Sequence, residues 1–401
     1  MNMKRILLIL LLLINLIPCM NAQKKEMNQA RTFVKSGKNL DKAEQMMRKL
    51  LNDSANRTND KIYVVLFDAI RQQYDQGNEK LYLRQKYDTA QLFVSARKMF
   101  QVLESLDSLD ATPDKKGRVE LKYRRKHADF LMNYRTNLYN GGVYFMSKQK
   151  FADAFHFFDS YIDCARQPLF SDQRLDSLDT RLPEAAYWAV VSAYQAQDME
   201  STLKYRDLAQ RDTTHLSSAL QYIADTYRMK GNKCLYVNTL KQGFAHEPEF
   251  PYFFPRLMEH YTEANHPDSA LAVVNRVLEQ NDSNQVYLFA KSNVLLNMGK
   301  YAECIEICDS LIARNDSLAD AYLNVGVAYV NLAVEMDKVS RSRTKRTQVK
   351  TLYKKALPYM ERYRQLMPDE KKKWAPVLYN VYLNLNMGKQ FDEMDKLLNG
   401  E

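Results

Sequence analysis

The sequence predicts an all-α protein built as a solenoid of antiparallel helix pairs. Glycine and proline, the two residues that break regular structure, number only 11 each among 401 residues, which favours long helices joined by short connections. The chain also matches itself at a spacing of about 34 residues. Within each unit the large apolar residues lie three and four positions apart, as they do on one face of a helix. A repeat of this length has room for two helices, and stacked repeats of this kind form a solenoid.

The first helix of the repeat is visible in four successive units. Its apolar positions are Leu220, Ile223 and Tyr227, then Phe254, Leu257 and Tyr261, then Leu288 and Leu295, then Tyr322, Val325 and Tyr329. The position after the second of these is small in three units, where it is Ala224, Ser292 or Gly326. A small side chain there lets the second helix approach closely. Lys291 stands at an expected apolar position of the third unit.

Turn residues separate the predicted helices. Gly231 and Gly299 stand where the first helix should end, as a C-cap glycine would. Asp282 and Asp316, each followed by serine, suit a turn and a new N-cap.

One unit carries the full pattern of a known repeat family, apart from an insertion. It comprises Tyr322, Val325-Gly326 and Tyr329 in the first helix, and Ala356, Met360, Tyr363 and Pro368 in and after the second. This pattern resembles the tetratricopeptide repeat (TPR) family, which has 18 fewer residues between Tyr329 and Ala356. The resemblance implies a right-handed superhelix of helix pairs.

The resemblance is clear over residues 136–398 and weak before them. An upstream unit contains Leu138, Gly141-Gly142, Phe145, Phe151, Ala154, Phe158 and Tyr161. A degenerate unit follows over residues 187–209, and residues 374–398 read as a capping helix pair. We therefore expect a signal peptide over residues 1–22, a degenerate helical region over 23–135 and a TPR solenoid over 136–401. Residues 111–126 and 167–183 are expected to be loops between packed parts.

The insertion forms a basic segment at about residues 338–355. Its candidate contact residues are Arg341, Arg343, Lys345 and Arg346. A cationic segment of this kind favours contact with anionic lipid, polysaccharide or an acidic protein. A solvated loop is the plainer alternative.

The N-terminus reads as an export signal. Lys4 and Arg5 precede an apolar run of 12 residues, too short for the roughly 20 that span a bilayer. Cleavage after Ala22 would release a periplasmic protein, like the signal-bearing TPR proteins of the Gram-negative envelope that it resembles. Lipid attachment at Cys19 is the alternative, although Pro18 stands where a lipoprotein signal needs a small residue.

Charge and motifs exclude several classes of function. Loss of Lys4 and Arg5 with the signal reduces the net charge from +10 to +8, a moderate excess that does not predict nucleic-acid binding. We find no phosphate loop, nucleophile elbow or zinc helix, and so expect no catalytic, cofactor or metal site. A loose group of His246, His260 and His266 with nearby glutamates is the only feature that favours an enzyme.

The cysteines do not predict a disulfide framework. Cys164, Cys234, Cys304 and Cys308 remain after cleavage, and their pairing cannot be read from spacing. Cys304 and Cys308 occupy buried positions of the repeat and are expected to pack in the core.

The resemblance also implies a binding surface. In the TPR family the first helices line an inner groove, and the matching positions here are Gln221, Asp225, Arg228, Tyr252, Glu259, Glu263, Phe289, Asn293 and Asn297. Aromatic and hydrogen-bonding side chains suit an extended or helical peptide. We expect a non-enzymatic scaffold that binds a protein or peptide in the periplasm. The alternative is a structural envelope protein that docks on anionic surfaces through its basic loops.

Overall fold

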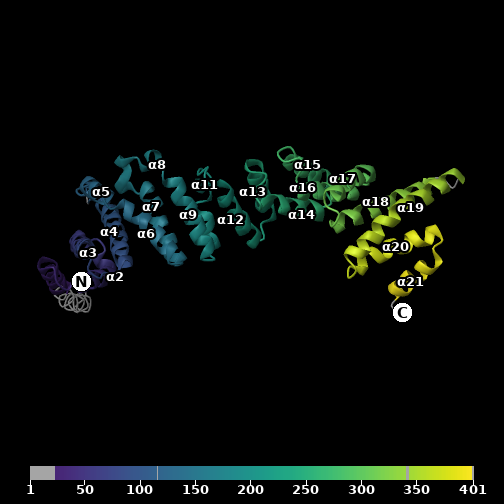
Figure 1. Ribbon diagram of the computed structural model, residues 1–401. Coiled ribbons are helices and arrows are strands. Elements are labelled where there is room, and N and C mark those ends of the chain that lie inside the picture. Colours follow the sequence, from purple (N-terminus) through teal and green to yellow (C-terminus); the bar gives the residue numbers. More distant parts are fainter. Residues whose placement is uncertain (1–22, 115, 340–342, 400–401) are drawn as a thin grey trace, which may run out of the picture. The chain divides into compact units, whose positions relative to one another are not determined.

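The computed structural model describes residues 23–114, 116–339 and 343–399, which form helices and turns without any β-strand (Figure 1). This confirms the predicted fold class. The expected signal segment, with Cys19 and Ala22, lies outside the described residues, as does Arg341. No helix in the described part of the chain combines the length and the hydropathy needed to cross a bilayer.

The chain divides into two compact units, and the division falls between Lys233 and Cys234. The boundary expected at residues 135–136 lies inside the first unit.

The first unit begins with long helices. After a helix over residues 23–36, its elements are α2 (Leu40–Asn52), α3 (Asp60–Tyr82), α4 (Thr89–Asp110), α5 (Arg124–Met132), α6 (Arg135–Ser147), α7 (Phe151–Asp163), α8 (Leu175–Leu178), α9 (Leu182–Gln195), α10 (Met199–Lys204), α11 (Arg206–Ala209) and α12 (Leu216–Met229). Helices α3 and α4 have 23 and 22 residues, so they exceed the length of a standard repeat helix. Asn59 and Asp88 cap them by accepting backbone N–H groups.

The pair α6 and α7 shows why its sequence contains two adjacent glycines. A Cβ atom at Gly141 would lie 2.5 Å from the Phe157 ring, and one at Gly142 would lie 2.6 Å from the Phe158 ring. Both phenylalanines are fully buried. The two glycines therefore allow α6 and α7 to pack closely.

The second unit contains the regular repeats. Its helices are α13 (Lys233–His246), α14 (Phe253–Glu263), α15 (Pro267–Leu278), α16 (Gln285–Asn297), α17 (Tyr301–Arg314), α18 (Ala319–Val339), α19 (Arg343–Leu366), α20 (Lys371–Leu385) and α21 (Gly388–Asn399). The second helices α13, α15 and α17 begin at a constant interval along the chain, as predicted. Gly299 adopts φ +74° directly after α16, which confirms its role in ending that helix. The N-cap of α16 is Asn284, whose side chain accepts from the N–H of Val286, so the cap lies one residue after the expected Ser283.

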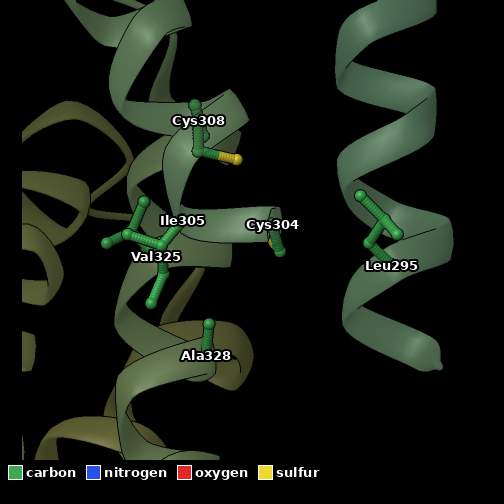
Figure 2. Close-up of a cluster of buried hydrophobic side chains, with 7 residues drawn as sticks. Leu295, Cys304, Ile305, Cys308, Val325 and Ala328 are labelled. Atoms are coloured by element: carbon green, nitrogen blue, oxygen red, sulfur yellow. The ribbon is translucent and has the colours of Figure 1, made fainter. Parts of the chain in front are cut away.

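Apolar side chains between the helices hold this stack together. Leu295 from α16, Cys304 and Cys308 from α17, and Val325 and Ala328 from α18 meet in one buried cluster (Figure 2). The prediction that both cysteines pack in the core is thus confirmed.

The described residues of the insertion, 338–339 and 343–355, are helical, which corrects the expectation of a basic loop. It lengthens both helices of one repeat, so that α18 has 21 residues and α19 has 24, against 13 and 14 in α16 and α17. The two long helices run side by side and project past their neighbours (Figure 1). Buried Val349 and Tyr353 pack with Val330 and Ala333 across the pair. Such contacts stabilise a helical hairpin. The charged sequence by itself predicts a solvent-exposed loop.

Candidate functional site

The first helix α16 presents a row of three predicted contact residues. Phe289, Asn293 and Asn297 are spaced four apart, which places them along one helix face. Phe289 and Asn293 are half-buried and Asn297 is exposed. The structure thus brings an aromatic ring and two amides into one line, as expected.

A hydrogen-bond network orients the middle residue of that row. The Nδ2 of Asn324, on α18, donates to Asn293 Oδ1 over 2.7 Å and to Ser292 Oγ over 3.2 Å. Ser292 in turn donates to the carbonyl oxygen of Phe289 at 2.7 Å. Because Oδ1 of Asn293 is used as an acceptor, its amide N–H groups point away from Asn324. No described residue accepts them, so they are free to meet a carbonyl of a ligand.

The preceding first helix α14 carries acidic residues at the equivalent positions. Glu259 and Glu263 hold the places that Asn293 and Asn297 hold one repeat later, and both glutamates are exposed. The predicted contact residue Tyr252, the N-cap of α14, is only 5% exposed. The Arg256 guanidinium lies 3.7 Å from the centre of its ring and donates to its carbonyl oxygen. The prediction that Tyr252 lines an open groove is therefore wrong, because the chain packs around it.

The remaining three predicted residues belong to α12 in the first unit. Gln221 is half-buried and Arg228 is exposed. Asp225 is only 7% exposed, and its carboxylate pairs with Arg228 at 2.9 Å and accepts from the Tyr194 hydroxyl at 3.5 Å. A buried carboxylate with two partners in its own unit is a structural group, so the expectation that Asp225 lines an open groove is also wrong.

The geometry of the second unit decides what kind of repeat this is. Its helices pair with a period of about 34 residues. A small residue stands where two helices cross, since a Cβ atom at Gly326 would lie 2.3 Å from Met360 Sδ. The repeat therefore has the helix-pair geometry of a tetratricopeptide-like solenoid. No protein-family model matches the chain.

One curated protein matches part of this chain, namely Hsp70-Hsp90 organizing protein 3 of Arabidopsis thaliana. The two are 32% identical over 88 residues, which is 22% of this chain and 13% of that protein's length.

Solved TPR structures are similar at lower identity. The C-terminal part of a TPR protein of Cytophaga hutchinsonii is 11% identical, with a TM-score of 0.42 over 64% of this chain and 92% of that one. YrrB, described as a TPR protein with an unusual peptide-binding site, is 17% identical, with a TM-score of 0.35 over 49% and 92% of the two chains.

Two residue groups of this chain are not predicted by its sequence. Asn324 is 6% exposed within an otherwise apolar stretch of α18, and a polar residue in such a stretch is a usable signal of a buried hydrogen bond. Thr344, Thr347 and Thr351 line a cavity on α19 together with Arg343. This second group was hidden because the segment was taken for a loop.

The predicted basic residues differ in their surroundings. On α19, Arg343 and Arg346 are exposed and Lys345 is half-buried. The basic residues near position 124 are partly structural, since Nε and Nη2 of Arg124 both donate to the Asp107 carboxylate at 2.8 Å. The exposed Arg343 and Arg346 on α19 remain candidate cations for an anionic partner.

The thiols and histidines form no chemical centre in the described residues. Cys164, Cys304 and Cys308 are buried free thiols, and Cys234 is exposed. The hydrogen bond between Cys304 and Cys308, together with burial, raises the pKa of Cys304. Within residues 23–399, excluding the gaps, no group of three or more histidine, cysteine or acidic residues is placed to hold a metal ion.

One carboxyl group in the first unit has a strongly shifted pKa. Burial beside Asp163 raises the pKa of Glu104 from its usual 4.5 to about 8, although a hydrogen bond from the Cys164 thiol opposes this. Asp163 accepts a hydrogen bond from Gln167 at 2.6 Å. The half-buried Glu104 therefore favours its neutral, protonated form more strongly than an exposed carboxyl group does.

Proposed function

We propose that this TPR protein is a non-enzymatic scaffold, and that the first-helix face of its second unit holds a protein or peptide partner. The observation that carries the proposal is the orientation of Asn293. Its amide is fixed from behind by Asn324, so its two N–H donors are presented without the entropic cost of ordering a free side chain. An oriented amide beside an aromatic ring is suited to a peptide backbone.

The neighbouring residues define the contacts of such a peptide. Phe289 supplies apolar area, and Asn293 donates to a backbone carbonyl. Asn297 provides a second amide one turn further along α16. Glu259 and Glu263 on α14 add negative charge, which favours a peptide with basic side chains or a free N–H group near that end. The name of the Arabidopsis relative describes a protein that organises two chaperones, which agrees with a scaffold role.

The test is partner capture by a triple variant. Glu259→Ala, Asn293→Ala and Asn297→Ala together should abolish capture of the partner from an envelope extract, with unchanged helical circular dichroism. The control replaces exposed Glu303 and Glu306 on the second helix α17 by alanine, which should leave capture intact. Equal capture by the triple variant and the unmodified chain would remove this surface from consideration.

We also propose that the protein acts in the periplasm. The support is the basic start and the apolar run at residues 4–17. Mass spectrometry of the N-terminus from the native host should find a chain that begins at Gln23. A lipid-modified chain that begins at Cys19 would show the alternative, and an intact Met1 terminus would argue against both.

A second candidate function is docking on anionic envelope material. It is favoured by the cations of α19, where Arg343, Lys345, Arg346, Lys350, Lys354 and Lys355 lie in a helix with no acidic residue before Glu361. Replacing these six cations by glutamine should then release the protein from membranes at low salt.

A further inference from the structure

The projecting part of the α18–α19 hairpin carries a cavity of about 650 Å³. Seven of its lining residues come from one side of α19, over a length of roughly 18 Å at 1.5 Å per residue. These are Arg343, Thr344, Thr347, Gln348, Thr351, Leu352 and Lys355, and Met336 completes the lining from α18. A lining of this length along one helix matches the side of another helix.

The lining is more apolar than its residue types suggest. Met336 and Leu352 are half-buried and pack on the core between the two helices. The hydroxyls of Thr347 and Thr351 donate to the carbonyl oxygens of Arg343 and Thr347, at 3.2 and 2.9 Å. Because both hydroxyl groups donate within α19, the two threonines present their methyl groups to the cavity alongside its polar side chains.

The cavity lies beyond the start of α17. The Tyr301 hydroxyl, at the beginning of α17, donates to Glu335 at 3.2 Å, and Glu335 directly precedes Met336. Further along, Tyr359 on α19 donates to Asp309 on α17 at 2.9 Å. Helix α17 therefore covers this flank of the hairpin up to the level of the cavity. A helix bound in the cavity would extend in the direction of α17 and cover the part of the hairpin flank that α17 leaves open.

Positive charge surrounds the cavity. From Glu335 to Met360 the sequence has two carboxylates, of which Glu335 is bound by Tyr301, whereas α19 alone has six cations over the same stretch. Arg343 and Lys355 stand at the two ends of the lining on α19. The Lys355 ammonium lies 5.6 Å from the centre of the Tyr329 ring, which holds it near the cavity. No ion pair between described residues uses either cation.

We propose that this cavity is a docking site for an acidic amphipathic helix of a protein partner. Apolar side chains of the helix contact Met336, Leu352 and the threonine methyl groups, and its carboxylates pair with Arg343 and Lys355. A flat anionic lipid surface would reach the exposed cations but not the half-buried floor of the cavity. This site is independent of the first-helix face on α14 and α16.

The test measures binding of a labelled helical peptide to the full chain by fluorescence anisotropy. The probe is an 18-residue amphipathic peptide of leucine, alanine and glutamate, and its counterpart has lysine in place of glutamate. Arg343→Glu with Lys355→Glu should weaken binding of the acidic probe about tenfold or more. The control, Lys371→Glu with Lys372→Glu, makes the same change in net charge on exposed residues of α20 and should change binding less than about twofold.

A second variant distinguishes a loss of the binding site from misfolding of the first variant. Thr347→Glu with Thr351→Glu places repelling carboxylates at exposed positions of the lining without removing any core contact, and it should weaken binding to a similar degree. Failure of the chain to bind the acidic probe, or equal losses in the test and control variants, would overturn the proposal. Loss of binding to phosphatidylglycerol vesicles, with peptide binding unchanged, would assign the cations to a lipid surface instead. Capture through Asn293 is measured separately, so the two proposals fail independently.

Discussion

The amide nitrogen of Asn324 lies 2.7 Å from Oδ1 of Asn293 and joins two successive first helices, α16 and α18. Asn324 is almost fully buried and also serves Ser292, which is completely buried. Thus one core asparagine links the packing of the repeat to the orientation of a residue on the candidate binding face.

Replacing Asn324 by alanine should affect both stability and binding. The change removes two hydrogen bonds, leaves a small cavity and lets the Asn293 amide rotate. We expect a loss of about 1–3 kcal/mol in the free energy of unfolding, measured by urea denaturation, together with weaker partner capture. The matched control is exposed Asn380→Ala on α20. Full partner affinity in the Asn324 variant would show that Asn293 needs no support.

Replacing Gly326 by alanine should destabilise the hairpin through overpacking. Its Cβ would lie 2.3 Å from Sδ and 2.6 Å from Cγ of Met360, which is itself fully buried. We expect a cost of about 1–3 kcal/mol by denaturant titration. Adding Met360→Ala should make the double variant more stable than the sum of the two single changes predicts. Nothing lies within 4 Å of a Cβ at Gly388, so Gly388→Ala should cost nothing. Strict additivity at Gly326 and Met360 would refute the steric explanation.

Glu104 should make the stability of the first unit depend on pH. Its pKa is near 4.5 in the unfolded chain and about 8 in the fold, so the folded state binds more protons between these values. Its contribution is complete below pH 4.5 and is lost as the pH rises toward 8, at up to about 1.4 kcal/mol per pH unit. Glu104→Gln stays neutral and should flatten this part of the stability curve, measured as melting temperature against pH. Exposed Glu120→Gln is the control, and identical slopes for Glu104→Gln and the unmodified chain would contradict the assignment.

The four described thiols should differ sharply in reactivity. Cys234 is exposed, whereas Cys164, Cys304 and Cys308 are fully buried. Maleimide labelling of the native protein, mapped by mass spectrometry, should modify Cys234 and spare the other three until denaturant is added. Cys234→Ser should abolish native labelling among these four positions. Rapid native labelling of Cys304 would mean that the cluster around α17 opens readily.

Much of this fold could be predicted because a helix is a local structure. The spacing of Leu220, Ile223 and Tyr227, repeated from one unit to the next, determines which face of each helix is apolar. Small residues such as Gly326 mark where two helices meet. The row of Phe289, Asn293 and Asn297 followed from the same periodicity.

Other parts of the candidate site could not be predicted, because burial depends on which helices stack beside a residue. Asp225 occupies a groove position in the repeat, yet it is buried and accepts a hydrogen bond from Tyr194 on α9. Tyr252 is buried as well. The basic insertion lacks a regular repeat pattern, yet its described residues from Arg343 onward form helix α19, where Val349 and Tyr353 pack against α18.

By itself, the sequence determined that this protein is a stack of helix pairs with a regular period, since turn residues and apolar spacing act over a few positions. Only the tertiary structure decided which polar residues remain available to a partner. In the folded chain Asp225 and Tyr252 are buried, and Asn324 orients Asn293. The α18–α19 hairpin projects and carries a cationic cavity. The physical reason is that exposure and hydrogen-bond orientation arise between helices, from residues more than 30 positions apart in the chain.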